Sequence, residues 1–332
     1  MNDAIHPRRL GVGSHVRVVA PARSLSIISS NVREIADAKL AEMGVTRSYG
    51  QRAEFNETLS SADPRDRVRD LEEAFTDPSV DAIFTSIGGF NSIELLTMID
   101  FVKLAGSPKI ICGYSDITVI VNAIHSMTGM VTYYGPHYSS LGMRDGNEFT
   151  LSYLRACLFS DEPFTVEPSP RWSQDAWFIN QDDRTFEPNP GIVVIQPGEA
   201  EGRLVGGNIN AFRLLNGTRF APSLTGTLLF LENDGLDKDM TPVEFNRRLE
   251  TILLQRGGDA VKGLIIGRFK TEAKMSIDQL RAIIASKEEL AGKPVIGGVD
   301  FGHTMPMITM PIGGTARLTA TRGEPRFEII RH

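Results

Sequence analysis

Residues 109–118 read KIICGYSDIT and join two apolar segments through a short polar corner. The run Ile110–Cys112 predicts a short buried strand. Gly113 supplies a tight turn, because a residue without a Cβ adopts backbone conformations that other residues resist. The apolar segment after this turn, which continues to about Thr128, predicts a buried helix. Ser115 therefore lies at a corner between a strand and a helix.

Ser115 at this corner has two interpretations. In the first, Ser115 or Asp116 caps the helix by accepting a backbone N–H, as these residue types often do. In the second, Ser115 is a nucleophile, and the free N–H groups of the helix N-terminus lie beside a developing negative charge. Residues 113–117 lack the second glycine of the G-x-S-x-G nucleophile motif. The corner alone leaves both interpretations open.

The first 160 residues alternate predicted strands and helices. The predicted strands span 16–22, 44–48, 80–87 and 110–112, and the predicted helices span 27–43, 61–77 and 93–99. This alternation predicts parallel strands with helical crossovers, hence a doubly wound, mainly parallel α/β domain. Ligands bind at the carboxyl ends of such strands, where Gly88-Gly89-Phe90 and 113–116 form two neighbouring loops. The glycine pair is not a G-x-G-x-x-G motif, so it is either a plain turn or a source of backbone amides for an oxyanion.

Composition changes after residue 160. Residues 161–191 contain five prolines, many charges and both tryptophans, Trp172 and Trp177. We divide the chain into an N-terminal α/β domain (1–160), a linker and loop (161–198) and a C-terminal mixed α/β domain (199–332). The aromatic side chains either fix the linker to a domain or cover a ligand. The C-terminal elements are predicted as helices at 209–215, 242–255 and 276–291, strands at 227–231, 263–266 and 294–297, and a hairpin of 316–319 with 326–330.

The overall composition excludes several classes of protein. The chain has 332 residues, of which 41% are hydrophobic and 23% charged, as in a globular protein with a proper core. A net charge of -6 and a pI near 5.6 argue against nucleic-acid binding. Cys112 and Cys157 lie in apolar runs, which predicts buried free thiols, and without C-x-x-C or H-E-x-x-H no metal site is expected. No run approaches the ~20 apolar residues of a membrane span, and no signal sequence is evident, so we expect a cytoplasmic protein without membrane attachment.

Three polar side chains follow predicted strands at distant points of the sequence: Ser115, Glu232 and His303. Each of them alone is more often structural than catalytic. Together they are the nucleophile, carboxylate and base that acyl transfer requires, and the order Ser, Glu, His occurs in other serine hydrolases. Their spacing in the sequence does not show whether they meet.

The chain resembles the LD-carboxypeptidase family of serine peptidases, and within it the microcin C immunity type. The resemblance extends over nearly the whole length and rests on several motifs in the same order. These are 61–71, 81–84, Gly88-Gly89-Phe90, 113–116, 206–208, 230–232, 263–269 and 299–304. An ordered set of this kind is far more specific than any single motif.

The resemblance implies a role for each strand-end residue. Ser115 is expected to be the nucleophile, His303 the general base and then acid, and Glu232 the group that orients His303. The oxyanion hole is expected at the backbone N–H groups of Gly89 and Asp116. The active site is expected at the interface of the two domains, without a cofactor, in a homodimer.

The tryptophan-bearing loop indicates the subfamily. Microcin-type relatives stack such a tryptophan on a nucleobase, and we favour Trp177 over Trp172 for that contact. Asn208 is the candidate for holding the aminoacyl group, and Phe90 is a further substrate-binding candidate. These features predict a serine peptidase that cleaves the amide between an aspartyl-type residue and a nucleotide-like group, detoxifying microcin C-like peptidyl or aminoacyl nucleotides. Two alternatives stay open: an LD-carboxypeptidase that acts on murein tetrapeptides, and a non-catalytic ligand-binding protein.

Overall fold

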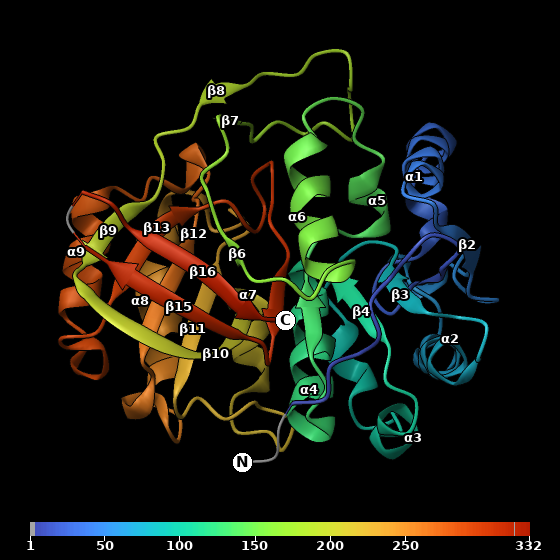
Figure 1. Cartoon of the computed structure of the whole chain (residues 1–332), viewed down its shortest axis with the longest axis horizontal. Helices are drawn as coiled ribbons and strands as arrows, with labels where there is room; N and C mark the ends of the chain where they lie inside the picture. The colour runs from blue at the N-terminus through green and yellow to red at the C-terminus, as the bar shows by residue number, and fades with distance from the viewer. Residues whose placement is uncertain (1–3, 322) are drawn as a thin grey trace.

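The computed structural model describes residues 4–321 and 323–332, which form two units, each built on one sheet (Figure 1). The N-terminal unit has a six-stranded sheet in the order β14-β5-β4-β3-β1-β2. Its strands are β1 (His15–Val19), β2 (Thr46–Tyr49), β3 (Ala82–Thr85), β4 (Ile110–Gly113), β5 (Thr132–Tyr134) and β14 (Met310–Ile312). All neighbouring strands are parallel except β14 and β5. The predicted doubly wound, mainly parallel domain is therefore confirmed.

The helices of this unit are α1 (Ser30–Glu42), α2 (Pro64–Thr76), α3 (Phe101–Ala105), α4 (Thr118–Thr128), α5 (Tyr138–Leu141) and α6 (Glu148–Leu158). Helices α1 to α4 lie in the connections between its parallel strands, and α5 and α6 follow β5. Helix α2 begins as its sequence predicts, because the Asp63 side chain accepts the N–H of Arg65 and Pro64 occupies the first turn. In the part of the chain that the structure describes, no helix is both long and apolar enough to cross a membrane.

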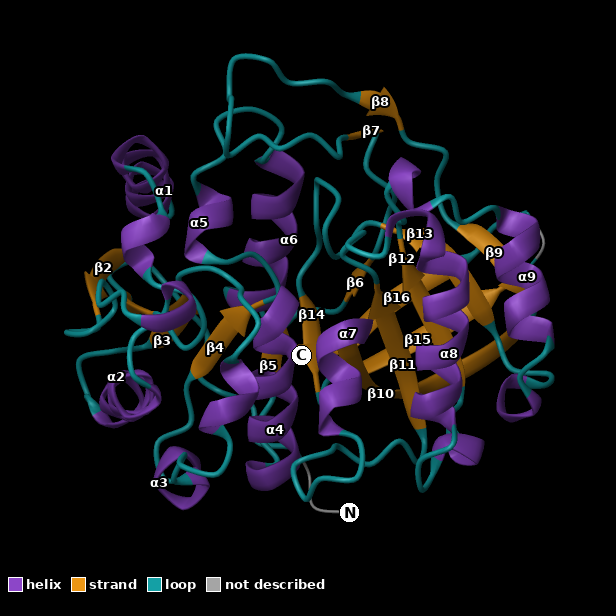
Figure 2. Ribbon diagram, turned by 180° about the vertical axis from the view of Figure 1, so that it is seen from behind, coloured by secondary structure: helices purple, strands orange, loops and turns teal. Residues whose placement is uncertain are grey.

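The C-terminal unit has an eight-stranded mixed sheet in the order β6-β16-β15-β10-β11-β12-β13-β9. Its strands are β6 (Phe164–Thr165), β9 (Val193–Gln196), β10 (Gly198–Asn208), β11 (Thr227–Glu232), β12 (Gly263–Gly267), β13 (Val295–Val299), β15 (Thr315–Ala320) and β16 (Arg326–Arg331). Strands β10 to β13 are parallel, and β15 and β16 form the predicted antiparallel hairpin. Figure 2 shows α7 (Ile209–Phe212), α8 (Thr241–Leu253) and α9 (Ile277–Ala285) along this sheet. The predicted mixed α/β class is confirmed.

Several strands were not predicted, β5, β6 and β9 among them, and for two others, β14 and β10, the physical reason is clear. Strand β14 contains Pro311, which usually argues against a strand, but β14 is the outer strand of its sheet, where proline is tolerated. Strand β10 contains Gly206 and Gly207, which interrupt the apolar pattern. A Cβ on Gly206 would lie 1.9 Å from the carbonyl oxygen of Phe230, so glycine permits the close approach of β10 to β11.

Three predicted helices are shorter than expected. In place of the helix predicted at 93–99 there is a 3₁₀ turn, Ser92–Leu95. A separate helix, α3, begins after it, because the Asp100 side chain accepts the N–H groups of Val102 and Lys103 as a cap. The helix predicted at 276–291 ends at Ala285, and Lys287 then turns to pair with Glu250 of α8 at 2.7 Å. The helix predicted at 209–215 becomes a 3₁₀ turn after Phe212.

The segment between the two units is ordered by short strands. Strand β6 pairs with β16, and β7 (Arg171–Trp172) pairs with β8 (Glu187–Pro188) above the C-terminal unit in Figure 1. Cys112 and Cys157 are buried and unbonded, as predicted. The predicted domain borders at 160 and 198 stay predictions, since β14 returns to the N-terminal sheet from the last quarter of the chain.

The two units meet where α4 packs on β10. Asn122 donates to the carbonyl oxygen of Gly206 at 2.8 Å, and the Thr118 hydroxyl accepts the N–H of Asn208 at 3.0 Å. A Cβ on Gly207 would lie 2.7 Å from Thr118 Oγ1 and would push the units apart. This interface therefore brings the start of α4 against the carboxyl ends of β10 and β11.

Candidate active site

Ser115 occupies a strained corner between β4 and α4. Its φ of +60° is in the left-handed region, which non-glycine residues rarely adopt and which costs about 1–2 kcal/mol. No side chain caps either the 3₁₀ turn Ser115–Ile117 or α4. The Asp116 carboxylate instead accepts the N–H of Ser92 at 2.9 Å. The interpretation of Ser115 or Asp116 as a helix cap is therefore wrong, and strain of this kind is typical of functional sites.

The structure brings Ser115, Glu232 and His303 together, and we call these three residues the triad. His303 Nε2 lies 3.0 Å from Ser115 Oγ. His303 Nδ1 lies 2.9 Å from Glu232 Oε2 and 3.1 Å from Oε1. The residues come from the turn after β4, the end of β11 and the loop after β13, so both units contribute. The arrangement can pass a proton from the serine to the imidazole while the carboxylate holds the ring.

Two glycines allow the chain to approach Glu232 closely. Gly302, with φ +101°, precedes His303, and a Cβ there would lie 2.5 Å from the Glu232 carboxylate. A Cβ on Gly267, at the end of β12, would lie 2.7 Å from the Cβ of Glu232. The carboxylate is thus enclosed by backbone that larger residues would displace.

The charges of Glu232 and His303 stabilise each other. Burial alone would raise the pKa of the fully buried Glu232, but His303 and hydrogen bonds from His303, Tyr134 and Asn208 hold this pKa below its usual value. The Tyr134 hydroxyl donates at 2.7 Å and Asn208 Nδ2 at 2.9 Å. Burial lowers the pKa of His303, yet attraction to Glu232 outweighs it and raises that pKa above its usual value. An ionised Glu232 therefore draws the ring proton to Nδ1 and leaves the Nε2 lone pair facing Ser115.

A cavity of about 550 Å³ opens on Ser115 and His303. Its wall includes Arg23, Gly88, His137, Trp177, Phe178 and Lys270. Arg23 and Lys270 make the wall positively charged, whereas the carboxylate of Asp175 is paired with Arg184 at 2.9 Å. The cavity can therefore accept a ligand that carries negative charge and an aromatic or apolar group.

The other predicted site residues lie at different distances from this cavity. Trp177 is on the wall, whereas Trp172 lies away from it, with the Arg268 guanidinium 5.3 Å from its ring. Asn208 lies behind the triad: its side chain accepts the N–H of Ala211 and donates to Glu232. Phe90 is 73% exposed and is not on the wall. The substrate contacts of Trp172, Asn208 and Phe90 therefore stay predictions that this arrangement does not favour.

The expected oxyanion donors belong to two loops that touch. A Cβ on Gly88 would lie 2.9 Å from the Cβ of Ser115, so the glycine pair packs directly on the nucleophile candidate. Gly89 is the next residue in that loop, and Asp116 follows Ser115. Their backbone N–H groups stay the predicted donors. Among the described residues, no group of three or more His, Cys, Asp or Glu side chains is arranged to hold a metal ion.

Two site residues, Tyr134 at the end of β5 and His137 just after it, were not predicted from the sequence. Tyr134 bonds Glu232, and the buried His137 lies on the cavity wall with its Nδ1 2.8 Å from Thr85 Oγ1. Burial and the charge of His303 hold the pKa of His137 well below its usual value, so this second imidazole is neutral. Tyr134 ends β5 and His137 follows it, and because no strand was predicted there, the strand-end argument applied to Ser115 did not reach these residues.

Gly113 makes the corner possible, and we expect Gly113→Ala to be destabilising. Its Cβ would lie 2.1 Å from Thr85 Oγ1, a fixed neighbour in β3. Overpacking of this kind costs about 1–3 kcal/mol in the free energy of unfolding. Denaturant titration with circular dichroism measures the loss. Gly11→Ala is the matched control, since nothing lies within 4 Å of its added Cβ, and equal stability of the two variants would contradict the argument.

A two-unit α/β chain with a serine, histidine and carboxylate at the interface has the site of a serine hydrolase. The family of LD-carboxypeptidases matches it in two parts: the N-terminal domain over residues 16–135 and the C-terminal domain over residues 201–318. The chain belongs to this family of serine peptidases.

Relatives and solved structures agree with this assignment. YocD of Bacillus subtilis, a carboxypeptidase by name, is 42% identical over 99% of this chain and 100% of its own. The microcin C7 self-immunity protein MccF of Escherichia coli is 30% identical over 75% of this chain and 74% of its own. The crystal structure of an MccF-like protein from Bacillus anthracis has a TM-score of 0.98 and 42% identity, covering 99% of this chain and 100% of that one.

Proposed function

We propose that this protein is a serine peptidase that cleaves the amide between an aspartyl-type residue and a nucleotide-like group, and so detoxifies microcin C-like peptidyl or aminoacyl nucleotides. The observation that carries the proposal is the 3.0 Å contact between Ser115 Oγ and His303 Nε2 in a cavity whose wall includes Trp177. Family resemblance extends the proposal to a cytoplasmic homodimer.

The proposed reaction follows from the geometry of the triad. Ser115 Oγ attacks the carbonyl carbon of the scissile amide while His303 Nε2 takes the hydroxyl proton. The backbone N–H groups of Gly89 and Asp116 stabilise the oxyanion. His303 then gives its proton to the leaving nitrogen, and an acyl-enzyme forms. Water, activated by the same imidazole, attacks the ester and restores Ser115.

The wall of the cavity supports this substrate class. Trp177 and Phe178 provide an aromatic surface of the kind on which a base stacks. Arg23 and Lys270 supply positive charge for a carboxylate or phosphate-like group. Solved structures of MccF include complexes with aspartyl sulfamoyl adenosine and glutamyl sulfamoyl guanosine. We extend that ligand chemistry to this chain as part of the proposal.

Product analysis tests the proposed activity directly. Purified protein is incubated with a processed microcin C-like compound and, separately, with a murein tetrapeptide, and the products are identified by mass spectrometry. We expect release of the amino acid from the nucleotide part. Cleavage of the tetrapeptide alone would contradict the proposed substrate.

A murein tetrapeptide is the second candidate substrate because of one specific relative. A murein peptide carboxypeptidase, by name, of Bacillus subtilis is 32% identical over 94% of this chain. The same triad would hydrolyse the bond to a terminal D-residue, and only the recognition of the leaving group would differ. The alternative of a non-catalytic binding protein predicts that a fluorophosphonate leaves Ser115 unlabelled, whereas the proposal predicts labelling at Ser115 alone.

Replacing Trp177 separates the two substrates. Base stacking on an aromatic side chain contributes about 1–3 kcal/mol, so we expect Trp177→Ala to lower kcat/KM on the nucleotide substrate about 10- to 100-fold. Activity on a murein tetrapeptide should change far less, and Trp177→Phe should retain most of the nucleotide activity. Steady-state kinetics on both substrates measures this. An equal loss on both would show that Trp177 only supports the loop.

A further inference from the structure

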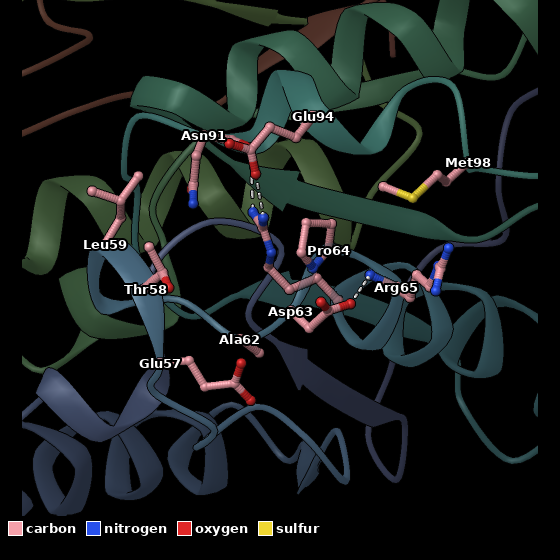
Figure 3. Close-up of a pocket in the computed structure, with 11 residues that line it drawn as sticks. Glu57, Thr58, Leu59, Ala62, Asp63, Pro64, Arg65, Asn91, Glu94 and Met98 are labelled. Carbon is pink, nitrogen blue, oxygen red and sulfur yellow. Dashed lines mark hydrogen bonds and ion pairs between the residues drawn. The ribbon is translucent and has the colours of Figure 1, made fainter.

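Arg67 is a buried arginine outside the cavity, with only 3% of its surface exposed. It lies on α2, and its Nη1 donates to the carbonyl oxygens of Pro21 and Asn91, both at 3.2 Å. Its Nη2 pairs with Glu94 Oε2 at 2.7 Å. Figure 3 shows this ion pair as dashed lines from Glu94 in a pocket of about 450 Å³, with Asn91 close by.

The two carbonyl groups belong to the loops that form one side of the candidate active site. Pro21 lies in the loop after β1, which continues to Arg23 on the cavity wall. Arg23 in turn donates to the carbonyl oxygen of Gly88, from its Nε at 3.1 Å and its backbone N at 3.4 Å. Asn91 ends the loop that contains the glycine pair. One guanidinium therefore joins the loop after β1 to the loop after β3.

The same loop is fixed from the side of the nucleophile. Ser92, the residue after Asn91, donates its N–H to Asp116 Oδ2 at 2.9 Å and its hydroxyl to the Asp116 carbonyl at 2.8 Å. The end of the 88–91 loop is thus held by hydrogen bonds from two directions: Arg67 bonds Asn91 from the side away from the cavity, and Asp116 bonds Ser92 from the side of the nucleophile. Because the Asp116 anchor follows Ser115 directly, the loop position and the nucleophile position are mechanically linked.

We propose that Arg67 is a positioning residue, which sets the distance between the Gly89 N–H and Ser115 by holding the end of the 88–91 loop. The inference rests on the proposed function, in which that N–H stabilises the oxyanion. The planar guanidinium has a fixed fork of donors, so it can hold two carbonyls and one carboxylate at defined angles, which an ammonium cannot do. A misplacement of about 1 Å at a reacting centre can lower a rate about 100-fold.

The test compares Arg67→Met and Arg67→Lys with Arg69→Met, a control on the exposed side of the same helix. We expect kcat of Arg67→Met to fall about 10- to 100-fold with KM changed less than about twofold, since Arg67 itself lies outside the cavity and Arg23 keeps its own bonds to Gly88. Arg67→Lys should restore little, because its ammonium lacks the fork. The rate of fluorophosphonate labelling at Ser115 should fall in parallel, and active-site titration corrects every rate for the folded fraction.

Glu94→Gln is the second variant, since the half-exposed Glu94 tolerates replacement without loss of the fold. It removes the charge that fixes the guanidinium, so we expect kcat to fall about 3- to 10-fold at constant KM. If the Arg67 and Glu94 variants both show wild-type rates per titrated active site, this inference is overturned, and the proposed function is unaffected. A wild-type protein that neither hydrolyses a substrate nor reacts at Ser115 would overturn the proposed function and, with it, this inference.

Discussion

Ser115→Ala will lower kcat about 10⁵- to 10⁶-fold and leave substrate affinity nearly unchanged. The hydroxyl is the atom that forms the bond to the acyl carbon in the proposed reaction. The neutral imidazole of His137 lies on the same wall with its Nδ1 2.8 Å from Thr85 Oγ1, so any residual turnover of the variant would point to this ring. Binding should persist because most of the cavity wall is formed by other residues.

The measurement pairs single-turnover kinetics with isothermal titration calorimetry on the same preparation. Ser126→Ala is the matched control: Ser126 lies near the C-terminal end of α4, the helix that follows Ser115, and its hydroxyl donates to the carbonyl oxygen of Ala221 at 3.0 Å. Substantial turnover by the Ser115 variant would show that another group does the chemistry. A large loss of affinity would show instead that the serine belongs to the binding surface.

Relief of backbone strain provides a further readout in the same variant series. Ser115 has a left-handed conformation that a glycine would adopt without cost. A Ser115→Gly variant should therefore be as inactive as the alanine variant but at least as stable. The difference between the two variants measures what the protein gives up in stability to hold the hydroxyl in place.

The fold could be predicted largely from alternating patterns in the sequence. Buried runs such as Ile110–Cys112 and Thr227–Leu231 became strands because both faces of a parallel sheet are covered, which gives continuous apolar segments. Strand β14 could not be found in this way, since Pro311 is acceptable only at a sheet edge. That edge exists only after β5 is in place, so the information lies in the tertiary structure.

The candidate site was partly predictable because its triad residues follow strands that the apolar pattern predicts. Polar residues at strand ends indicated Ser115, Glu232 and His303, and the family resemblance assigned their roles. The supporting contacts were out of reach, because Tyr134 and Glu232 lie 98 positions apart and meet only when the two units pack. Arg67 gave no signal at all, since a charged residue in an amphipathic helix is normally exposed.

Glu232→Gln will lower kcat about 10⁴-fold, although the substitution preserves shape. Tyr134 and Asn208 both donate to Oε1, so the glutamine oxygen will take that position. Its amide nitrogen must then face His303 Nδ1 as a donor. The imidazole responds by carrying its proton on Nε2, where it points at Ser115 and cannot accept the serine proton. The His303 ring therefore keeps its orientation, but its proton is on the nitrogen that should accept the serine proton.

The Glu232→Gln variant will also shift the pH dependence of kcat/KM, and the direction of the shift follows from the charges around His303. In the native protein Glu232 raises the pKa of His303 above its usual 6.5, so kcat/KM should rise with pH through a midpoint above 6.5, as the base loses its proton. Without this carboxylate, burial is the largest remaining cause and lowers the pKa of His303; Lys270 acts in the same direction and only Asp234 opposes it, so the midpoint should move to lower pH. Profiles of kcat/KM from pH 5 to 9 measure the midpoint in the native protein and in the variant. Glu250→Gln, which removes a paired carboxylate remote from the triad, is the control. An unchanged midpoint in the Glu232 variant would mean that the limb belongs to another group, and His303 would lose its place as the base.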